Sequence, residues 1–493
     1  MSLLLAFFCL TATTAHGASA SHRPAGAPPH AAYSSPNDLP VRTGDPLLDG
    51  AERNAIAVLS ANQVGDTHRA APFYVGPWIR DSYAWGMVPD NRGTLGTYAT
   101  TELAYWLGKQ QASGAWITFK YSGWYDETPI FIAAVLDAYR QTGDRAMVRR
   151  ALPALRRAWN WLDQSYVTPQ NGSSCLLWVT IHPDFVPIAA DWADQVARTG
   201  YTPQLEGLWL RATRALAALE LAGGDIKGAT PYQQASGCIE HDVNRLLWST
   251  SAPTHLDAPP LAAFGHFRAS PSPRDYFEID GNALLLSLGE SNRRDRAKVL
   301  GTVMAHASYL LGASGSEPAR VLYGDYDPAD YAGIHNWMAP GRYQSAYWPS
   351  VGGLLALAAA RDDHTATAIT ILRGLARAGT ASKGAFYEWY GEDGTANGAT
   401  TYGWGARMYL LALYRAMLGV DDSPSLADPA GLVLRAAPGP ASGEMIRLGL
   451  HIYIKGHSSG RFISARVDGK PWRSSKVPAR LLHNGTVIDV YRK

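Results

Sequence analysis

Apolar residues recur every three or four positions along most of the chain between residues 45 and 420, which is the spacing of one face of an α-helix. Proline suits the first turn of a helix and glycine the residue after its last turn, and both mark the ends of periodic segments here. Pro203 marks one beginning, and Gly143 and Gly419 mark ends. The pattern predicts helices over residues 45–61, 94–109, 128–142, 145–164, 203–222, 230–249, 278–289, 293–312, 347–361, 364–378 and 402–419.

The loops between these predicted helices are alternately short and long, an arrangement typical of stacked helical hairpins. Six such hairpins closed into a ring form an all-α (α/α)6 barrel, and this is the fold class that we predict for residues 41–420. An α-solenoid is the competing architecture, but the sequence lacks the fixed repeat period that solenoids have.

Beyond the last predicted helix the hydrophobic pattern changes. Residues 421–445 contain many Asp, Ser, Pro and Gly residues and are predicted to form a linker. Across residues 446–454 apolar side chains occupy every second position, which predicts one β-strand with a buried face. Asp468-Gly469 and Asn484-Gly485 are predicted hairpin turns, because both pairs tolerate positive φ. We therefore expect residues 446–493 to form a small β-sheet domain.

The first 40 residues differ from the rest of the chain. Leu3–Leu10 is an apolar run and Ala18-Ser19-Ala20 is a small-residue cleavage site, so residues 1–20 are predicted to be a signal peptide cleaved after Ala20. Residues 21–40 are rich in Pro, Ala and Ser and are predicted to be a flexible lead. No later segment is apolar over the length of a membrane span. We therefore expect a secreted or periplasmic protein.

Composition narrows the class of protein. Hydrophobic residues make up 46% and charged residues 17% of the chain, which indicates a large buried core and excludes disorder. The net charge of +2 gives no sign of a nucleic-acid groove. Cys9 lies in the signal, so Cys175 and Cys238 remain, either as one disulfide or as two buried free thiols. Without a Cys-x-x-Cys motif or a close histidine pair, we predict no metal and no cofactor.

Aromatic residues are abundant, with 16 Trp and 25 Tyr, and many lie in segments rich in Gly and Asp. A tryptophan in a polar loop can stack on the apolar face of a sugar ring while its N–H binds a hydroxyl. Packing beneath long loops is the other explanation. Four segments combine such aromatic residues with charged ones and are the candidates for chemistry.

The first of these segments holds Trp78, Arg80 and Asp81. Arginine donates several hydrogen bonds, aspartate accepts two, and tryptophan supplies a wall, which together suit the hydroxyls of a terminal sugar. A structural Arg–Asp pair is the alternative. Because adjacent side chains on a helix point apart, each residue of such a pair needs another partner.

The second segment holds Trp124, Asp126 and Glu127, just before a predicted helix that starts with Thr-Pro. Aspartate at this position is a good N-cap, because its carboxylate accepts hydrogen bonds from the first free backbone N–H groups. A residue that caps a helix at the mouth of a barrel also faces the pocket, so a structural role and a binding role are compatible.

The third and fourth segments supply candidate catalytic carboxylates. Asp191 and Asp194 flank Trp192, and a carboxyl group against an aromatic wall loses solvation, which raises its pKa and suits a general acid. Glu388 is followed by Trp389 and precedes the last predicted helix, where a carboxylate could deprotonate a water. A buried glutamate paired with an arginine is the alternative.

In their order and spacing these segments resemble those of the six-hairpin glycosidases, which include glucoamylase, the amylo-α-1,6-glucosidase part of glycogen debranching enzyme and the processing α-glucosidases. Trp78-Ile79-Arg80-Asp81 resembles the family's Trp-x-Arg-Asp segment, which binds the non-reducing terminal sugar. Asp191-Trp192-Ala193-Asp194 resembles the Thr-Trp-Met-Asp segment of debranching-type enzymes. Further similar pieces are Asp280-Gly281-Asn282, Tyr343-Gln344 through Trp348-Pro349, and Glu388 through Trp404. The resemblance covers roughly residues 70–420.

The resemblance implies an inverting glycoside hydrolase that acts on α-linked glycosides of an oligosaccharide or polysaccharide, by exo action from the non-reducing end, in the manner of an α-glucosidase. It places the general acid on Asp194 and the general base on Glu388, with carboxyl groups about 6.5–9.5 Å apart to admit a water. The residues that it implies in substrate binding are Trp78, Arg80, Asp81, Trp124, Asp126, Glu127, Trp192, Gln344, Trp348, Trp389 and Trp404. Asp191 departs from the family's threonine and competes for the acid role, and other departures leave the sugar open.

Two other classes of protein compete with this prediction. A polysaccharide lyase or unsaturated-uronide hydrolase on the same barrel would need histidine, tyrosine or arginine for a uronate carboxylate, and His182, His266 and His335 lie in predicted loops. A non-catalytic carbohydrate-binding protein would keep the barrel without the chemistry, although the presence of both Asp194 and Glu388 argues against it.

Overall fold

The computed structural model describes residues 39–74, 76–90, 92–116, 125–167, 174–179, 191–193, 196, 198–254, 258–270, 274–312, 318–330 and 343–493. All of them belong to one compact unit, Tyr33–Lys493. The predicted signal peptide and nearly all of the predicted flexible lead lie outside the described residues, so both stay predictions.

Every helical range predicted from the hydrophobic pattern contains a helix or a run of short helices. The longer helices are α1 (Pro46–Asn62), α5 (Glu127–Thr142), α6 (Arg145–Leu162), α7 (Pro203–Gly223), α8 (Ile226–Asp242), α9 (Ile279–Leu288), α10 (Arg293–Ala305), α12 (Pro349–Arg361), α13 (Thr365–Ala381) and α14 (Gly403–Leu418). Shorter ones are α2 (Ile79–Tyr83), α3 (Gly93–Thr97), α4 (Leu103–Leu107) and α11 (Ala307–Leu310). Of these, only α2 was not expected, because its five residues are too few to show a period.

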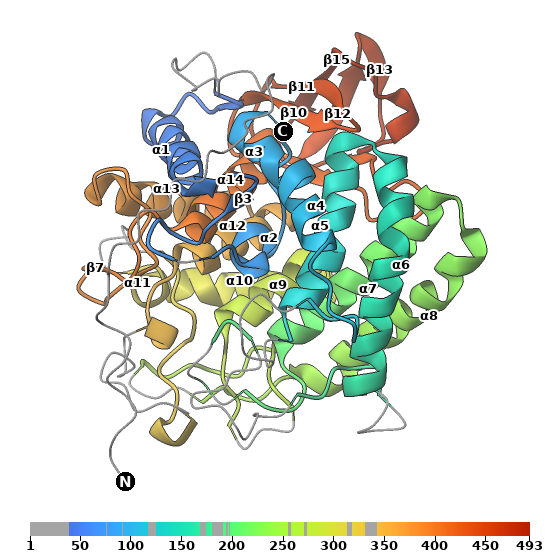
Figure 1. Ribbon diagram of the computed structural model, residues 1–493. Helices are drawn as coiled ribbons and strands as arrows, with labels where there is room; N and C mark the ends of the chain where they lie inside the picture. The colour runs from blue at the N-terminus through green and yellow to red at the C-terminus, as the bar shows by residue number, and fades with distance from the viewer. Residues whose placement is uncertain are drawn as a thin grey trace, which may run out of the picture. The chain divides into compact units, whose positions relative to one another are not determined.

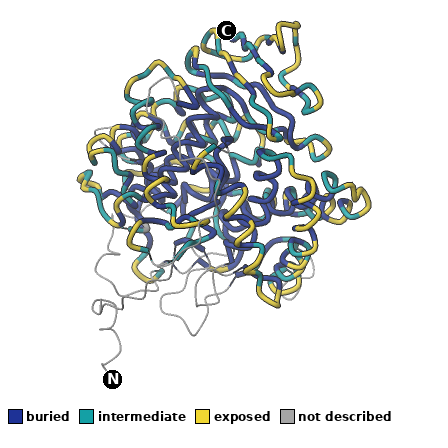
Figure 2. The backbone as a smooth tube through the Cα atoms, turned by 45° about the horizontal axis from the view of Figure 1, so that its top comes forward, coloured by how far each residue is buried: buried dark blue, intermediate teal, exposed yellow. Residues whose placement is uncertain are grey.

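Burial separates the helices into two sets. Every residue of α14 is buried, and α5, α7, α9 and α12 are buried around most of their circumference. In contrast, α6 buries one stripe, from Met147 to Leu162 at intervals of three or four residues, and exposes basic residues on its other side. The buried helices form the dark blue interior in Figure 2, with the exposed positions around them.

The N-terminal ends of neighbouring buried helices lie next to one another. Contacts run from α2 to α5, then to α7, α9, α12 and α14, and α14 in turn contacts α2. A Cβ on Gly281 in α9 would lie 2.7 Å from Cβ of Pro203 at the start of α7, and one on Gly405 in α14 would lie 2.8 Å from Cβ of Pro349 at the start of α12. Glycine at both positions therefore permits a close approach between first turns. These helices run in the same direction, and their N-terminal ends share one side of the fold.

The C-terminal part of the chain forms a six-stranded sheet in the order β1-β10-β11-β15-β12-β13. Its strands are β1 (Val41–Arg42), β10 (Ser442–Arg447), β11 (Leu450–Gly456), β12 (Phe462–Val467), β13 (Lys470–Trp472) and β15 (Thr486–Arg492). All neighbours are antiparallel except β11 and β15, which are parallel. Strand β1 comes from the other end of the chain, so the sheet joins both ends of the described sequence.

The prediction of one strand across residues 446–454 is wrong. The backbone turns at Leu448 and Gly449, whose φ values are 54° and 74°, and the two halves pair as the hairpin of β10 and β11. A turn of two residues does not interrupt the alternation of apolar and polar positions along the sequence. The hydrophobic pattern therefore gives no sign of the turn. Asp468-Gly469 is a hairpin turn as predicted, whereas Asn484-Gly485 leads into β15, which does not pair with the strand before it.

The predicted linker also contains strands. β8 (Val420–Asp422), β9 (Leu432–Leu434) and β14 (Lys476–Val477) form a three-stranded sheet, and β10 starts before residue 446. The six-stranded sheet lies at the C-terminal ends of buried helices: Leu448 N–H donates to Arg140 O of α5 (2.7 Å), and the Arg492 guanidinium donates to Leu418 O of α14 (2.7 Å). The three-stranded sheet is next to the same end of α14, because β8 begins two residues after this helix ends. Figure 1 shows the longer strands grouped beside the helices. The strand content is therefore larger than the predicted all-α class implies, and the domain limits stay predictions.

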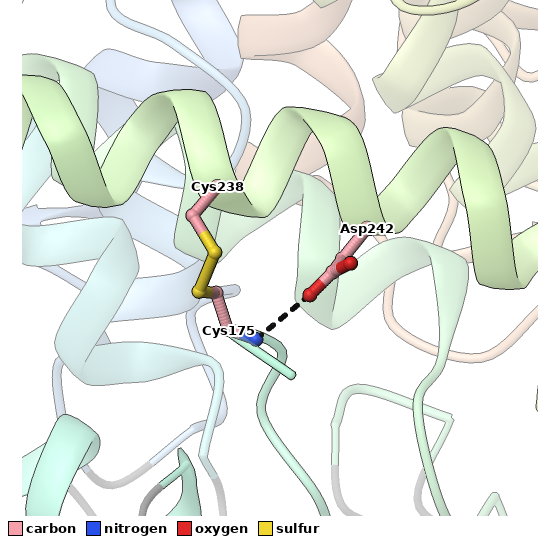
Figure 3. A group of neighbouring side chains, drawn as sticks. All are labelled: Cys175, Cys238 and Asp242. Atoms are coloured by element: carbon pink, nitrogen blue, oxygen red, sulfur yellow. Dashed lines mark hydrogen bonds between the residues drawn. A yellow bond between two sulfur atoms is a disulfide. The ribbon is translucent and has the colours of Figure 1, made fainter. Parts of the chain in front are cut away.

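Cys175 and Cys238 are joined as a disulfide that links the segment before α7 to α8, across 63 residues (Figure 3). The Asp242 carboxylate accepts a hydrogen bond from the Cys175 backbone N–H at 3.0 Å. Of the two alternatives left open by the sequence, the structure has the disulfide, and a metal site at this cluster is excluded because both sulfur atoms are bonded to each other. Among the described residues, no helix is both long and apolar enough to cross a membrane.

Candidate active site

Glu388 is held in place by a short hairpin. Its side chain is 5% exposed, its Oε2 accepts a hydrogen bond from Ala399 N–H (2.9 Å), and its own N–H donates to Ala399 O (2.9 Å). Strands β6 (Trp389–Tyr390) and β7 (Ala396–Asn397) form the hairpin. Gly398 has φ of +70°, and a Cβ there would lie 2.6 Å from Glu388 Oε2. Glycine is therefore needed beside this carboxylate, and one of its oxygens is fixed by a backbone N–H.

Two tyrosines lie next to Glu388. The Tyr74 hydroxyl is 3.5 Å from Glu388 Oε1. Burial raises the pKa of Tyr402 well above its usual range, and the negative charges of Asp81 and Glu388 raise it further. Tyr402 therefore stays protonated, and its hydroxyl donates to Asp81. Burial also raises the pKa of Asp81, while Arg80 and the Tyr402 hydrogen bond oppose the shift.

Arg80 and Asp81, which are adjacent in α2, have different partners. The Arg80 guanidinium binds Asp126 through Nε to Oδ2 (2.8 Å) and Nη2 to Oδ1 (3.2 Å). Asp126 precedes α5 as predicted, but its side chain makes no capping hydrogen bond, because both of its oxygens lie against Arg80. Burial raises the pKa of Asp126 to about 6, with Arg80 opposing the shift and Asp191 adding to it.

A buried arginine gathers three carboxylates beside this pair. Arg198 contacts Asp191 at 3.1 Å, Glu278 at 2.9 Å and Asp280 at 3.1 Å, and it is 4% exposed. The Tyr326 hydroxyl donates to Glu278 Oε1 at 2.8 Å. Burial raises the pKa of Glu278 to about 7, Arg198 opposes the shift, and Asp280 adds to it. The sequence reasoning missed Arg198 and Glu278, although Glu278 stands two residues before the Asp280-Gly281-Asn282 motif.

Asp191 is fully buried within this network. Both of its oxygens accept from Arg198, and Oδ1 also accepts from Ala193 N–H at 2.8 Å. Trp192, the next residue, donates from Nε1 to Asp280 Oδ2 at 2.9 Å. The segment 191–193 is thus anchored at two adjacent side chains, close to the start of α9.

Three of the predicted tryptophans pack against one another. The ring centroid of Trp192 lies 4.8 Å from that of Trp348 and 5.5 Å from that of Trp404. All three are at most 2% exposed. Tyr402 meets Trp348 at 6.3 Å, so the cluster spans the space between the Arg198 network and the Glu388 side of the site. In this structure they fit the packing explanation, and their stacking on a sugar stays a prediction.

The aromatic residues near the N-terminal end of α2 are more accessible. Phe73 is 64% exposed and stacks on Tyr74 with 4.5 Å between ring centroids. Trp78 is partly buried, with its ring 6.2 Å from that of Tyr74. Since Tyr74 also contacts Glu388, these rings form a row that leads from the carboxylate to the surface. Phe73 was missed because a single exposed aromatic residue has no sequence signature.

The remaining predicted residues divide into two groups. Glu127 is buried in the first turn of α5, and Trp389 is 8% exposed with its ring 6.2 Å from that of Tyr343. Asp194, Trp124 and the side chain of Gln344 lie outside the described residues, and so do His182 and His335. The separation of the two predicted catalytic carboxylates therefore stays a prediction.

His266, the remaining histidine of the lyase alternative, is fully buried on β5 (His266–Phe267). Its Nε2 lies 2.5 Å from Asp275 Oδ1, and Ser249 donates to the other oxygen of Asp275 at 2.7 Å. A histidine enclosed in this way is not available to a substrate, so it has a structural role.

No family model matches the sequence, and no curated protein matches it. Solved structures do match in fold. A GH78-family rhamnosidase of Bacillus sp. GL1 aligns over 87% of this chain and 40% of its own, with a TM-score of 0.57 and 16% identity. A bacterial glucoamylase complexed with acarbose aligns over 76% and 56%, with a TM-score of 0.53 and 13% identity. A GH63 mannosylglycerate hydrolase from Thermus thermophilus aligns over 73% and 99%, with a TM-score of 0.52 and 14% identity.

All three are (α/α)6-barrel glycosidases, so the resemblance stated from the sequence is confirmed at the level of the fold. The chain spans about half or less of the rhamnosidase and the glucoamylase, and nearly all of the mannosylglycerate hydrolase. The names of the three proteins refer to three different sugars, and at these identities the likeness shows the fold alone.

Proposed function

We propose that this protein is a secreted glycoside hydrolase with a closed (α/α)6 barrel, and that it cleaves an α-linked glycoside with inversion. The order of helix contacts, from α2 through α5, α7, α9, α12 and α14 back to α2, supports closure of the inner ring. The fold shared with three glycosidases supports the reaction class.

The observation that carries the proposal is the setting of Glu388. Its carboxylate is fixed by the Ala399 N–H and bordered by the Tyr74 hydroxyl, in a position that Gly398 keeps clear. A general base has to stay ionised and fixed in orientation while it draws a proton from a water. The Ala399 N–H supports both requirements, because a hydrogen bond to Oε2 favours the charged form and fixes the orientation of the carboxylate.

We assign the general acid to Asp194. Asp191, its competitor, is occupied by Arg198 and a backbone N–H, and an acid that transfers its proton to a leaving group cannot remain in a buried ion pair. The same contacts anchor residues 191–193, which come directly before Asp194 in the sequence. Arg198 is thus a positioning residue in this proposal, because it acts through the loop that carries the acid.

Secretion is part of the proposal. The predicted signal peptide supports it, and the Cys175–Cys238 disulfide is the kind of bond that persists in an oxidising compartment. Exo action from the non-reducing end remains our expectation from the Trp-x-Arg-Asp resemblance. α-Glucosides are the first substrates to try.

The test is hydrolysis of a panel of α- and β-linked oligosaccharides, followed by proton NMR of the freshly released anomer. We expect one class of α-linkage to be cut with release of the inverted anomer. Glu388→Gln and Asp194→Asn should each reduce kcat by about 10³-fold with an unchanged circular dichroism spectrum. Asp66→Asn, at an exposed carboxylate in the turn between β2 (Gln63–Val64) and β3 (Thr67–His68), is the control and should keep activity.

Four results would contradict the proposal. A retained anomer would require a covalent intermediate and a closer pair of carboxylates. Near-normal activity of both amide variants would remove the catalytic assignment. Binding of oligosaccharide by the folded protein without turnover of any linkage would favour the non-catalytic alternative, and new absorbance near 235 nm would favour a lyase.

A further inference from the structure

A cavity of about 320 Å³ lies among the C-terminal parts of the buried helices, beneath residues 420–429. Its walls come from α5, α7, α9, α12 and α14. On α5 it starts at Ala133 and includes Arg140, whereas Asp126 of the candidate active site precedes the first turn. From Asp126 to Arg140 the helix rises by about 20 Å, so the cavity is a second site, separate from Glu388.

The polar part of the cavity wall contains more arginines than carboxylates, and the arginines share those carboxylates. Arg140 and Arg211 share Asp137, at 2.9 and 2.6 Å. Arg361 and Arg435 share Asp421, at 3.2 and 3.4 Å.

The third carboxylate is shared more widely. Asp422 binds Arg415 and Arg447, both at 2.6 Å, and lies 3.4 Å from Arg140. Within the described part of the chain, these six arginines have no other carboxylate within ion-pair distance. Arg447 is not itself part of the cavity wall, whereas a further arginine of the wall, Arg214, pairs with Glu240 at 2.8 Å and Glu290 at 3.0 Å. Together these seven arginines share five carboxylates, so cations still outnumber anions.

The C-terminal ends of the helices compensate only part of the excess positive charge of these arginines. The C-terminal end of a helix carries roughly half a negative charge, which favours nearby arginines. Three of the arginines also donate to backbone carbonyls: Arg140 to Pro429 O (2.9 Å), Arg211 to Ala84 O (3.2 Å) and Arg415 to Val420 O (3.5 Å). Arg435 Nε is buried without a hydrogen-bond partner in the described structure. Burial also lowers the pKa of Arg211, with Arg140 adding to the shift, so its charge is incompletely compensated.

Apart from the charged residues and three serines, the wall is apolar and includes Trp85, Leu136, Leu284, Leu357, Leu411 and Leu426. A cavity that combines an apolar surface with convergent polar groups suits a small molecule that has both an apolar and a polar part. Guanidinium groups match the geometry of carboxylate and phosphate oxygens. An inorganic ion would satisfy the arginines and leave the apolar wall uncovered.

We propose that this cavity binds a small organic anion, whose carboxylate or phosphate group contacts the shared arginines and whose apolar body lies against the leucines. The ligand enters from the side of residues 420–429, which belong to no helix. The site does not depend on the proposed glycosidase activity, because it lies at the other end of the same helices.

The test uses four probes with the purified protein: benzoate, phenyl phosphate, inorganic phosphate and benzyl alcohol, at constant ionic strength. We expect a saturable rise in Tm with benzoate or phenyl phosphate, half-complete below about 1 mM, and little change with the other two. Isothermal titration calorimetry gives the stoichiometry, which should be one. The comparison of benzoate with phenyl phosphate tells which of the two oxyanions the arginines prefer.

Two variants locate the site. Leu426→Trp fills the cavity and leaves every arginine in place, and it should abolish the response. Arg211→Gln removes one cation while Arg140 still pairs with Asp137, and it should weaken binding at least ten-fold. Arg150→Gln, at a 69% exposed arginine, is the control and should respond like the unaltered protein.

Equal stabilisation by inorganic phosphate and phenyl phosphate would overturn the apolar part of the proposal. Equal stabilisation by benzyl alcohol would overturn the anionic part. No shift with any probe at 10 mM, or an undiminished response in Leu426→Trp, would overturn it altogether and leave the arginines as a structural network. None of these readings depends on whether a glycoside is hydrolysed.

Discussion

The two ends of the buried helices both hold buried carboxylates, and the environment shifts the pKa values of some of them, in opposite directions at the two ends. At the N-terminal end burial raises the pKa of Asp81, Asp126 and Glu278, the last two to about 6 and about 7. At the C-terminal end the arginines lower the pKa of Asp421 and Asp422, although burial opposes this.

The helix dipole would predict the reverse, because it favours anions at N-terminal ends and disfavours them at C-terminal ends. The helix dipole does not set the direction of the pKa shifts, because its contribution is the smaller one. A dipole contributes about 0.3–1 kcal/mol, whereas raising the pKa of Asp126 from 3.8 to about 6 corresponds to about 3 kcal/mol. Each end is governed by the number of charged partners: several carboxylates share Arg198 at one end, and several arginines share Asp422 at the other.

This difference has a chemical meaning. Carboxylates with raised pKa values and few cations can exchange protons near neutral pH, which suits acid–base catalysis. Carboxylates surrounded by arginines stay ionised and cannot. The N-terminal end is therefore suited to reaction, and the C-terminal end to stability or to binding an anion.

The largest expected effect is on catalysis at the N-terminal end. Glu388→Gln should lower kcat by about 10³-fold, equal to about 4 kcal/mol, because an amide cannot accept a proton from water. Steady-state kinetics on the substrate found in the panel measure it. Activity within three-fold of the unaltered protein would break the assignment of chemistry to this end.

Next is the loss of a shared anion at the other end. Asp422→Asn should reduce the free energy of unfolding by about 3–4 kcal/mol, because it leaves Arg415, Arg447 and Arg140 without their common partner. Urea unfolding measures the change. Asp489→Asn, whose partner His457 is 45% exposed, is the control in the neighbouring sheet and should cost less than about 0.5 kcal/mol. An equally small loss of unfolding free energy in Asp422→Asn would show that Asp422 does not stabilise the three arginines.

The pH dependence of stability should separate the two ends. The folded-state pKa of Glu278 is about 7, above its ordinary 4.5, so its contribution is fully present below pH 4.5 and is lost as pH rises through 7. The loss amounts to about 3 kcal/mol. Glu278→Gln should remove this part of the slope in unfolding experiments between pH 5 and 8.

Asp422 should show the opposite sign. Its folded pKa is lowered, so its contribution is present above pH 3.8 and is lost as pH falls below that value. Asp422→Asn should therefore flatten the acid side of the profile and leave the slope between pH 5 and 8 in place. Identical profiles for the two variants would contradict the contrast between the ends.

The smallest expected effect concerns the row of aromatic rings. Phe73→Ala should raise KM for a trisaccharide or longer substrate about five-fold, equal to about 1 kcal/mol, and leave a small aryl glycoside unaffected. The reason is that the exposed ring would stack on a sugar beyond the bond that is cut, and a small aryl glycoside has no such sugar. Ile226→Ala, at a 74% exposed residue of outer helix α8, is the control. An equal change for both substrates would assign Phe73 to the shape of the site and not to a distal sugar.

The sequence by itself determined the helices and the turn at Asp468-Gly469. The period of apolar residues depends on which face of a segment is buried, and Gly and Pro mark helix ends through their own backbone preferences. These are local properties. The strand hairpin at Leu448-Gly449 was missed because a two-residue turn leaves the alternation unbroken.

Only the tertiary structure decided the partners of the charged residues. Arg80 pairs with Asp126 and not with its neighbour Asp81, and Arg198 gathers carboxylates from two separate segments. Asp137 and Asp422 meet the same arginine although they are far apart in the chain. A sequence shows which residues are charged, but a pKa depends on how many partners a buried charge has, and packing of distant helices sets that number.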